Sequence, residues 1–117
     1  MGKRGIKLYL VDIMEASQRI VDYTKDLTFE NFAADQKTAD AVIKNFEIIG
    51  EAANNIPDEI MDQHPHINWL SIISMRNILV HEYFSISLDE IWNTVNEDIP
   101  NIKAQIKNVI EKEKGNL

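Results

Sequence analysis

Apolar residues recur at helical spacing along most of the chain. Between about residues 3 and 27, an isoleucine or leucine returns at every seventh position, which places one apolar stripe on a helix packed along its length. Between about residues 35 and 56, a second stripe repeats this pattern, and Asp35 is a candidate N-cap. The stripe residues are Ile6, Ile13, Ile20 and Leu27 in the first segment and Ala39, Val42, Phe46, Ile49, Ala53 and Ile56 in the second.

A proline and a loop follow the second predicted helix. Pro57 breaks that helix and opens a short helical turn that ends near Met61. The piece MDQHPHIN is then a loop, and its last residue, Asn68, is a candidate N-cap for a helix over residues 69–84.

A capping box begins the next helix. Ser87 and Glu90 have the spacing in which each side chain binds the other residue's backbone N–H, and the helix runs to about residue 98. Pro100 fits the first turn of a last helix, and the charged tail from about residue 111 is expected to fray. No segment alternates with the period of a strand. We therefore predict one all-α domain over residues 1–117, an antiparallel bundle of four long helices plus a short one.

Composition and charge narrow the classes of function. With 117 residues and 44% hydrophobic positions, the chain is long and apolar enough for one core. It has no cysteine, which excludes disulfides and thiolate metal sites. Asp12 interrupts the short apolar stretch after the basic start, so we expect no signal peptide, no membrane span and a cytoplasmic protein. The net charge of −7 disfavours a broad nucleic-acid coat, so any RNA needs a local basic site.

The segment suited to chemistry is Arg76–Tyr83, RNILVHEY. On a helix, Arg76 and Tyr83 lie nearly on one line, and Asn77 and His81 share an adjacent line. An imidazole can transfer a proton at an RNA 2′-hydroxyl or leaving oxygen, and a guanidinium binds phosphate oxygens. Arg76 and His81 point about 140° apart, so either the helix loosens near His81 or a second copy completes the site. On spacing alone, a structural role for this pair is the commoner outcome.

Beyond spacing, the chain resembles the HepT-like toxins of the HEPN family. The resemblance rests on the R-x4-H-x-Y motif in RNILVHEY and on three blocks that follow in the family's order over about residues 6–110. These blocks are FEIIGEAANNIP (46–57), INWLSIISMRNILVHEYF (67–84) and IWNTVNEDIPNI (91–102). The resemblance implies a five-helix HEPN fold, a homodimer whose motifs face a shared cleft, and a metal-independent endoribonuclease with no cofactor.

The resemblance also implies a role for each motif residue. Arg76 and His81 match the catalytic pair, and Asn77 matches the polar residue that follows the arginine. Tyr83 matches the tyrosine that a partner nucleotidyltransferase antitoxin, of the MNT type, adenylylates to silence the toxin. The toxin and this antitoxin would together form a type VII-like toxin–antitoxin system, and RNA is the toxin's substrate. In a dimer, two arginines and two histidines meet in one local positive cleft.

Three other residues are weaker candidates. Glu51 follows Gly50, at which another helix can approach closely. Glu51 could support the site by orienting the motif's arginine or histidine, although a plain surface or structural glutamate is the commoner case. His64 and His66 lie near acidic residues, but no further ligand cluster accompanies them, so we expect a solvated loop and no metal site.

A function of another class stays open. The chain could be a non-catalytic helical module that binds and regulates the nucleotidyltransferase, with Arg76 and His81 gripping a nucleotide or phosphate. The intact motif favours the enzyme. The sequence leaves open the RNA target, the cleavage site, the stoichiometry with the antitoxin and the number of adenylates on Tyr83.

Overall fold

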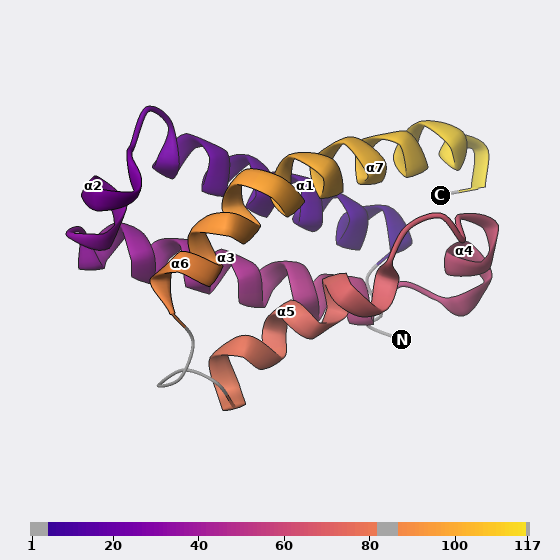
Figure 1. The fold of residues 1–117 in the computed structure, drawn as a ribbon. Coiled ribbons are helices and arrows are strands. Elements are labelled where there is room, and N and C mark those ends of the chain that lie inside the picture. Colours follow the sequence, from indigo (N-terminus) through magenta and orange to yellow (C-terminus); the bar gives the residue numbers. More distant parts are fainter. Residues whose placement is uncertain (1–4, 82–86, 117) are drawn as a thin grey trace.

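The computed structural model of the chain is a bundle of helices (Figure 1). It describes residues 5–81 and 87–116, with the backbone alone at 78–81 and 116. No strand occurs within these ranges, which confirms the all-α prediction. The long helices are α1 (Ile6–Thr24), α3 (Gln36–Asn54), α5 (Trp69–His81) and α7 (Ile99–Lys112). The shorter elements are α2 (Phe29–Ala33), α4 (Asp58–Gln63), α6 (Leu88–Asn93), the π-helix η1 (Thr94–Asp98) and the 3₁₀ turn η2 (Lys114–Asn116).

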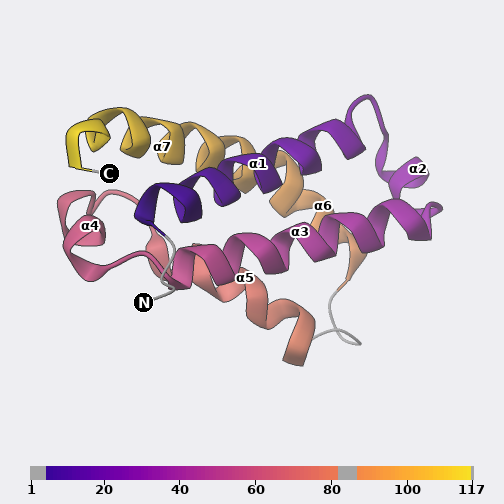
Figure 2. The same ribbon diagram turned by 180° about the vertical axis from the view of Figure 1, so that it is seen from behind.

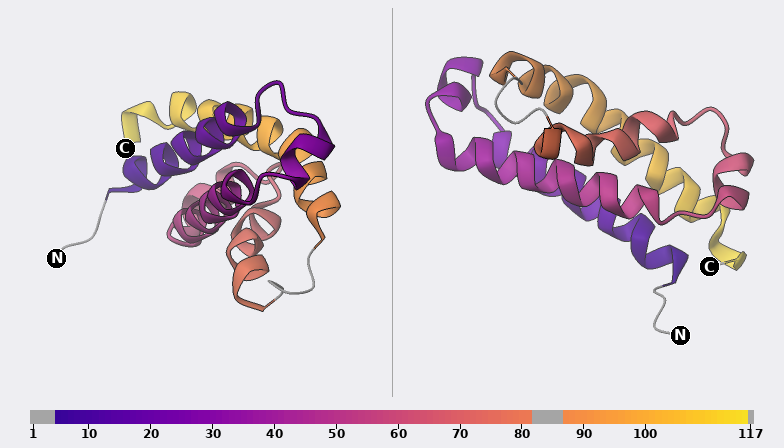
Figure 3. Two further views of the ribbon diagram at one scale, coloured as in Figure 1. Left: turned by 90° about the vertical axis from the view of Figure 1, so that its left-hand side faces the viewer. Right: turned by 90° about the horizontal axis from the view of Figure 1, so that it is seen from below.

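Helix α3 lies in the middle of the bundle. It packs against α1 on one side and α5 on the other, and α7 lies along α1 (Figures 1 and 2). Helix α5 is at the edge of the bundle. The short helices α2 and α4 lie at opposite ends of the bundle (Figure 3). Most of the two predicted stripes lie in the core: Ile13, Ile20, Val42, Phe46 and Ile49 are fully buried, whereas Ile6 and Leu27 are only partly buried. Ile106 and Val109 of α7 are fully buried as well.

The short helix α2 has no counterpart in the predictions. Its N-cap is Thr28, whose side chain accepts from the backbone of Asn31 at 3.1 Å. Phe32 of α2 is fully buried, and its ring centroid lies 5.0 Å from that of Trp92 in α6. A helix of five residues is too short to show a periodic stripe, so only tertiary packing on Trp92 reveals it.

The predicted caps are confirmed. Asp35 accepts from the backbone and the hydroxyl of Thr38 at the start of α3, and these hydrogen bonds lower the pKa of the Asp35 carboxyl. Asn68 accepts from the α5 backbone at 3.1 Å. Ser87 and Glu90 form the predicted capping box of α6.

The predicted break between residues 98 and 100 is wrong. α6, η1 and α7 follow one another without a gap, and the backbone at their junctions stays helical. Pro100 lies in the first turn of α7, as expected, but it has no N–H and its ring would meet the carbonyl of the previous turn. The wider π-turn accommodates the proline, and the Ile99 N–H donates to Thr94 across five residues.

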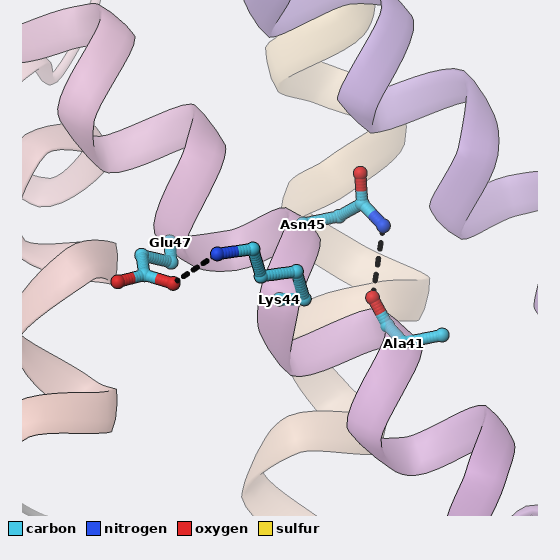
Figure 4. Close-up of polar contacts among 4 residues, drawn as sticks. All are labelled: Ala41, Lys44, Asn45 and Glu47. Carbon is cyan, nitrogen blue, oxygen red and sulfur yellow. Dashed lines mark hydrogen bonds and ion pairs between the residues drawn. The ribbon is translucent and has the colours of Figure 1, made fainter.

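An amide fixes α1 to α3 near the middle of the bundle. Asn45 is buried on α3, and its Nδ2 donates to the Ala41 carbonyl at 2.8 Å (Figure 4). Its Oδ1 is left to accept from Arg19 Nε on α1 at 2.9 Å. The bundle that presents α5 is therefore held by polar contacts as well as by its apolar core.

Candidate functional site

Arg76 lies at a close contact between α5 and α3. A Cβ added to Gly50 of α3 would lie 2.8 Å from the Ile73 carbonyl oxygen, 2.7 Å from Arg76 Cβ, and closer still to the Arg76 backbone nitrogen. These separations leave no room for a side chain at position 50. Glycine thus lets the two helix backbones touch at the residue that carries the guanidinium. The close approach expected at Gly50 is confirmed.

Glu51 contacts the guanidinium of Arg76. Arg76 Nη1 donates to Glu51 Oε1 at 3.3 Å, and the two side chains are 32% and 59% exposed. From the sequence, this contact was one alternative, and a plain surface or structural glutamate was the commoner case. In the structure Glu51 is both a surface residue and the partner of Arg76. Because water reaches both groups, the pair adds little to stability and is open to exchange with another anion.

The remaining motif residues are only partly described. Asn77 is exposed on α5. His81 is the last residue of α5, and its position is given by the backbone alone. Tyr83 lies outside the described residues. The structure therefore brings Arg76 and Glu51 together and does not test a contact of either with His81 or Tyr83.

The two histidines of the loop before α5 have different environments. His66 is exposed, as expected, but His64 is 4% exposed. His64 Nε2 lies 2.9 Å from Oε2 of Glu113, which is also buried. The expectation of a solvated His64 is wrong, because this pair places His64 against the tail. In that tail, predicted to fray from residue 111, α7 extends to Lys112 and Glu113 is buried. Within residues 5–81 and 87–116, no three histidine or acidic side chains gather in a way that would hold a metal ion.

Comparison with known proteins gives the family. The sequence profile described as Ribonuclease HepT-like matches residues 13–109, well over half of the chain. The chain belongs to the HepT-like ribonuclease family. The match includes Gly50, Glu51, Arg76 and His81, so this site lies within the family's region.

Two HepT-like relatives match over nearly their whole length, and a third over half of its length. A protein of Thermococcus cleftensis with the name "Probable ribonuclease HepT" is 45% identical over 105 residues, covering 90% of this chain and 96% of its own. A protein of Methanocaldococcus jannaschii named as a candidate RNase is 36% identical over 115 residues, covering 98% and 95%. A second protein of that organism carries the match in half of its length, and its name adds a gamma-glutamylcyclotransferase. No solved structure gives a significant match to this chain.

The helices can also be compared with the length and hydropathy of a membrane span. Among the residues that the structure describes, no helix is both long enough and apolar enough to cross a bilayer.

Proposed function

We propose that this HepT-like chain is the toxin of a toxin–antitoxin pair, a metal-independent endoribonuclease that works as a homodimer. Arg76 and His81 are its catalytic residues, and a nucleotidyltransferase antitoxin silences it by adenylylating Tyr83. The observation that carries the proposal is the placement of Arg76. Its backbone is fixed against Gly50 and its guanidinium is held by Glu51, yet about a third of the side chain is open to solvent. The names of the relatives support RNA as the substrate.

The reaction needs one proton taken and one proton given. The RNA 2′-hydroxyl loses its proton to an imidazole, and its oxygen attacks the adjacent phosphorus. The bond from phosphorus to the 5′-oxygen breaks, and that oxygen takes a proton from a second imidazole. The products are a 2′,3′-cyclic phosphate and a 5′-hydroxyl. Arg76 binds the phosphate oxygens and stabilises the charge that grows on them, while His81 is the group that moves protons.

The geometry of α5 favours a site shared by two copies. Arg76 and His81 are five residues apart, which is about 500° of rotation and so leaves them about 140° apart around a helix. α5 is α-helical from Trp69 to His81 without a π-turn, so the helix does not loosen before His81. Helical spacing alone therefore does not direct the two side chains of one copy toward the same point. A second copy that faces α5 would supply the missing half.

The outer face of α5 supports the same arrangement. Leu70 is 79% exposed there, although it is a large apolar side chain. Asn77, seven residues further along the same line, is also exposed. A dimer across this face would bury Leu70 and bring two copies of Arg76 near one another. That would create a local positive site on a chain of net charge −7.

Glu51 is the proposed positioning residue for Arg76. In the free protein its carboxylate holds the guanidinium at the contact between α3 and α5. A phosphate carries a similar pair of oxygen acceptors, so RNA can take the place of Glu51 or share the guanidinium with it. The exposed, stretched contact of 3.3 Å makes that exchange inexpensive.

RNA cleavage without metal is the direct test. The purified full-length chain, incubated with RNA in excess EDTA, is expected to cleave it and to leave 2′,3′-cyclic phosphate ends. Replacing His81 with Ala should slow cleavage by about 10²–10⁴-fold if this residue moves the proton. A folded His81→Ala protein that cleaves at the normal rate would remove His81 from the mechanism. Binding of the nucleotidyltransferase without any cleavage would instead indicate a non-catalytic regulatory module.

A further inference from the structure

A polar pocket between the start of α5 and the start of α7 has no role in the site described above. Its volume is about 200 Å³, and it lies on the side of α5 that faces η1 and α7. Ile72 and Ile102, both nearly buried, form its apolar part. The other lining residues are His66, Asn68, Ser71, Asp98, Asn101 and Gln105.

Most of the polar groups in this pocket are unengaged. Within the part of the chain that the structure describes, the side chains of Asp98, Asn101 and Gln105 make no hydrogen bond or ion pair. Asp98 stands at the N-cap of α7, but its side chain forms no cap hydrogen bond. Asn68 uses its Oδ1 to cap α5 and keeps its amide N–H groups. Several donors and acceptors thus line one small space, with Asp98 and Asn101 exposed to solvent and Gln105 half-buried.

The groove between α1 and α3 differs from this pocket because its charged groups are already paired. It is larger, about 290 Å³, but its charged side chains already have partners. Lys44 pairs with Glu47 at 3.1 Å (Figure 4), and Glu51 pairs with Arg76. A ligand would have to break these contacts to bind in that groove. A ligand in the pocket beside α5 would not have to break any such contact of Asp98, Asn101 or Gln105 within the described residues.

The chemistry of the pocket selects a neutral polar group rather than a phosphate. No lysine or arginine lines it, and Asp98 would repel an anion. The amides of Asn101 and Gln105 each offer N–H donors and a carbonyl acceptor, which is the pattern that nucleobase edges match. The apolar surface of Ile72 and Ile102 suits the flat face of a base.

We propose that this pocket binds one nucleobase of the substrate RNA, with a preference for guanine. Guanine presents two adjacent donors, at N1 and at its 2-amino group, which one carboxylate can accept together. Asp98 is the group that would accept them, and the amides of Asn101 and Gln105 would donate to O6 and N7. The inference rests on the proposed function, because it takes RNA as the ligand.

A polar strip connects the pocket with the motif. Ser71, Ser74 and Asn77 follow one another along α5, and all three are exposed. From Ser71 at the pocket to Arg76 is five residues, or about 7.5 Å along the helix axis at 1.5 Å per residue. That is roughly the rise of two stacked nucleotides. The same five residues also turn about 140° around the helix, so a base held in the pocket can fix which phosphate reaches Arg76 only if the RNA strand passes around α5.

Binding can be tested without any cleavage. Guanosine monophosphate is added to the ¹⁵N-labelled full-length chain, and the side-chain amide signals of Asn101 and Gln105 are followed by NMR. We expect saturable shifts with guanosine monophosphate, smaller shifts with uridine monophosphate and none with inorganic phosphate. Asp98→Asn should weaken guanosine monophosphate binding about tenfold. Glu97→Gln, which removes the same charge from an exposed neighbour outside the pocket, should leave it unchanged.

Two results of this titration would overturn the proposal. One is the absence of saturable shifts with guanosine monophosphate. The other is equal shifts with inorganic phosphate, which would mean that the pocket binds an anion.

Cleavage then tests specificity. On an RNA pool of random sequence, the wild-type chain is expected to cut at a fixed offset from guanine, and Asp98→Asn should lose this preference while Glu97→Gln keeps it. Cleavage with no preferred base at any offset would overturn the subsite. If the pool is not cut at all, the proposed ribonuclease function fails, and the nucleotide titration still decides whether the pocket binds a base.

Discussion

Oε2 of Glu113 lies 2.9 Å from Nε2 of His64, and both side chains are about 5% exposed. The two residues are 49 positions apart, so the contact joins the end of the chain to the loop before α5. The His64 carbonyl in turn accepts from Trp69 Nε1 at 3.1 Å, at the first residue of α5. The start of the helix that carries Arg76 is thus tied to the chain's C-terminal turn.

This buried pair leads to a prediction on stability. Replacing His64 with Ala leaves the Glu113 carboxylate buried without this partner, and we expect a loss of about 2–5 kcal/mol in the free energy of unfolding. Urea unfolding followed by circular dichroism measures the change. His66→Ala, at the exposed histidine two residues away, is the control and should cost much less. Equal stability of the two variants would show that the His64 contact contributes nothing.

The backbone contact at Gly50 gives a second prediction. Gly50→Ala places a methyl group where the Arg76 backbone and the Ile73 carbonyl lie, so α3 and α5 must separate. We expect a loss of about 1–3 kcal/mol of stability and a large loss of RNA cleavage, because Arg76 moves. The matched control is Gly115→Ala, since an added Cβ there has no neighbour within 4 Å. Unchanged stability and activity in Gly50→Ala would contradict the close approach.

If Glu51 positions Arg76, its replacement should lower the rate of RNA cleavage without lowering the stability of the fold. Glu51→Gln removes the charge that holds the Arg76 guanidinium, and we expect kcat for RNA cleavage to fall about tenfold while KM stays the same or decreases. Thermal stability should hardly change, because the pair is exposed. Glu47→Gln, one turn earlier on α3 and paired with Lys44 instead, should keep the wild-type kcat. A Glu51→Gln protein with wild-type kcat and KM would make Glu51 a plain surface residue.

The dimer is tested at Leu70. We expect the wild-type chain to be a dimer at micromolar concentration and Leu70→Glu to weaken the dimer at least about tenfold, because a charge replaces an apolar contact. Light scattering gives the mass, and the cleavage rate should fall with dimer content. Leu8→Glu, at an exposed leucine on α1, is the control and should stay dimeric. A wild-type monomer at these concentrations would rule out the shared site.

Silencing is tested at Tyr83, which lies outside the described residues. After co-expression with the nucleotidyltransferase proposed as its antitoxin, the chain should carry adenylate on Tyr83, as peptide mass spectrometry would show. The added phosphate and base would oppose Arg76 by charge and by bulk, so RNA affinity and cleavage should fall together. Tyr83→Phe should stay unmodified and active, and Tyr23, 42% exposed on α1, should carry no adenylate. A silenced toxin without adenylate on Tyr83 would mean that the antitoxin inhibits by binding alone.

The extent to which the sequence predicted this protein depends on how far apart the interacting residues are. The caps at Asp35, Asn68 and Ser87 involve partners within three positions, and each was found where the sequence placed it. The π-turn before Pro100 is also local, but the sequence predicted one helix ending near residue 98 and another beginning at Pro100, with no wider turn between them. α2 was missed because five residues are too few to show a periodic stripe, although its Phe32 packs against Trp92.

In the candidate site, too, local features could be predicted from the sequence, whereas contacts between helices could not. The sequence by itself determined the all-α class, the family and the motif residues Arg76 and His81, because spacing on one helix and resemblance need no neighbour. Only the tertiary structure decided that Glu51 contacts Arg76 and that His64 contacts Glu113. Those contacts depend on how closely separate helices approach. That distance is set by the packing of whole faces, with Gly50 at a close contact, and no local pattern in the sequence specifies it.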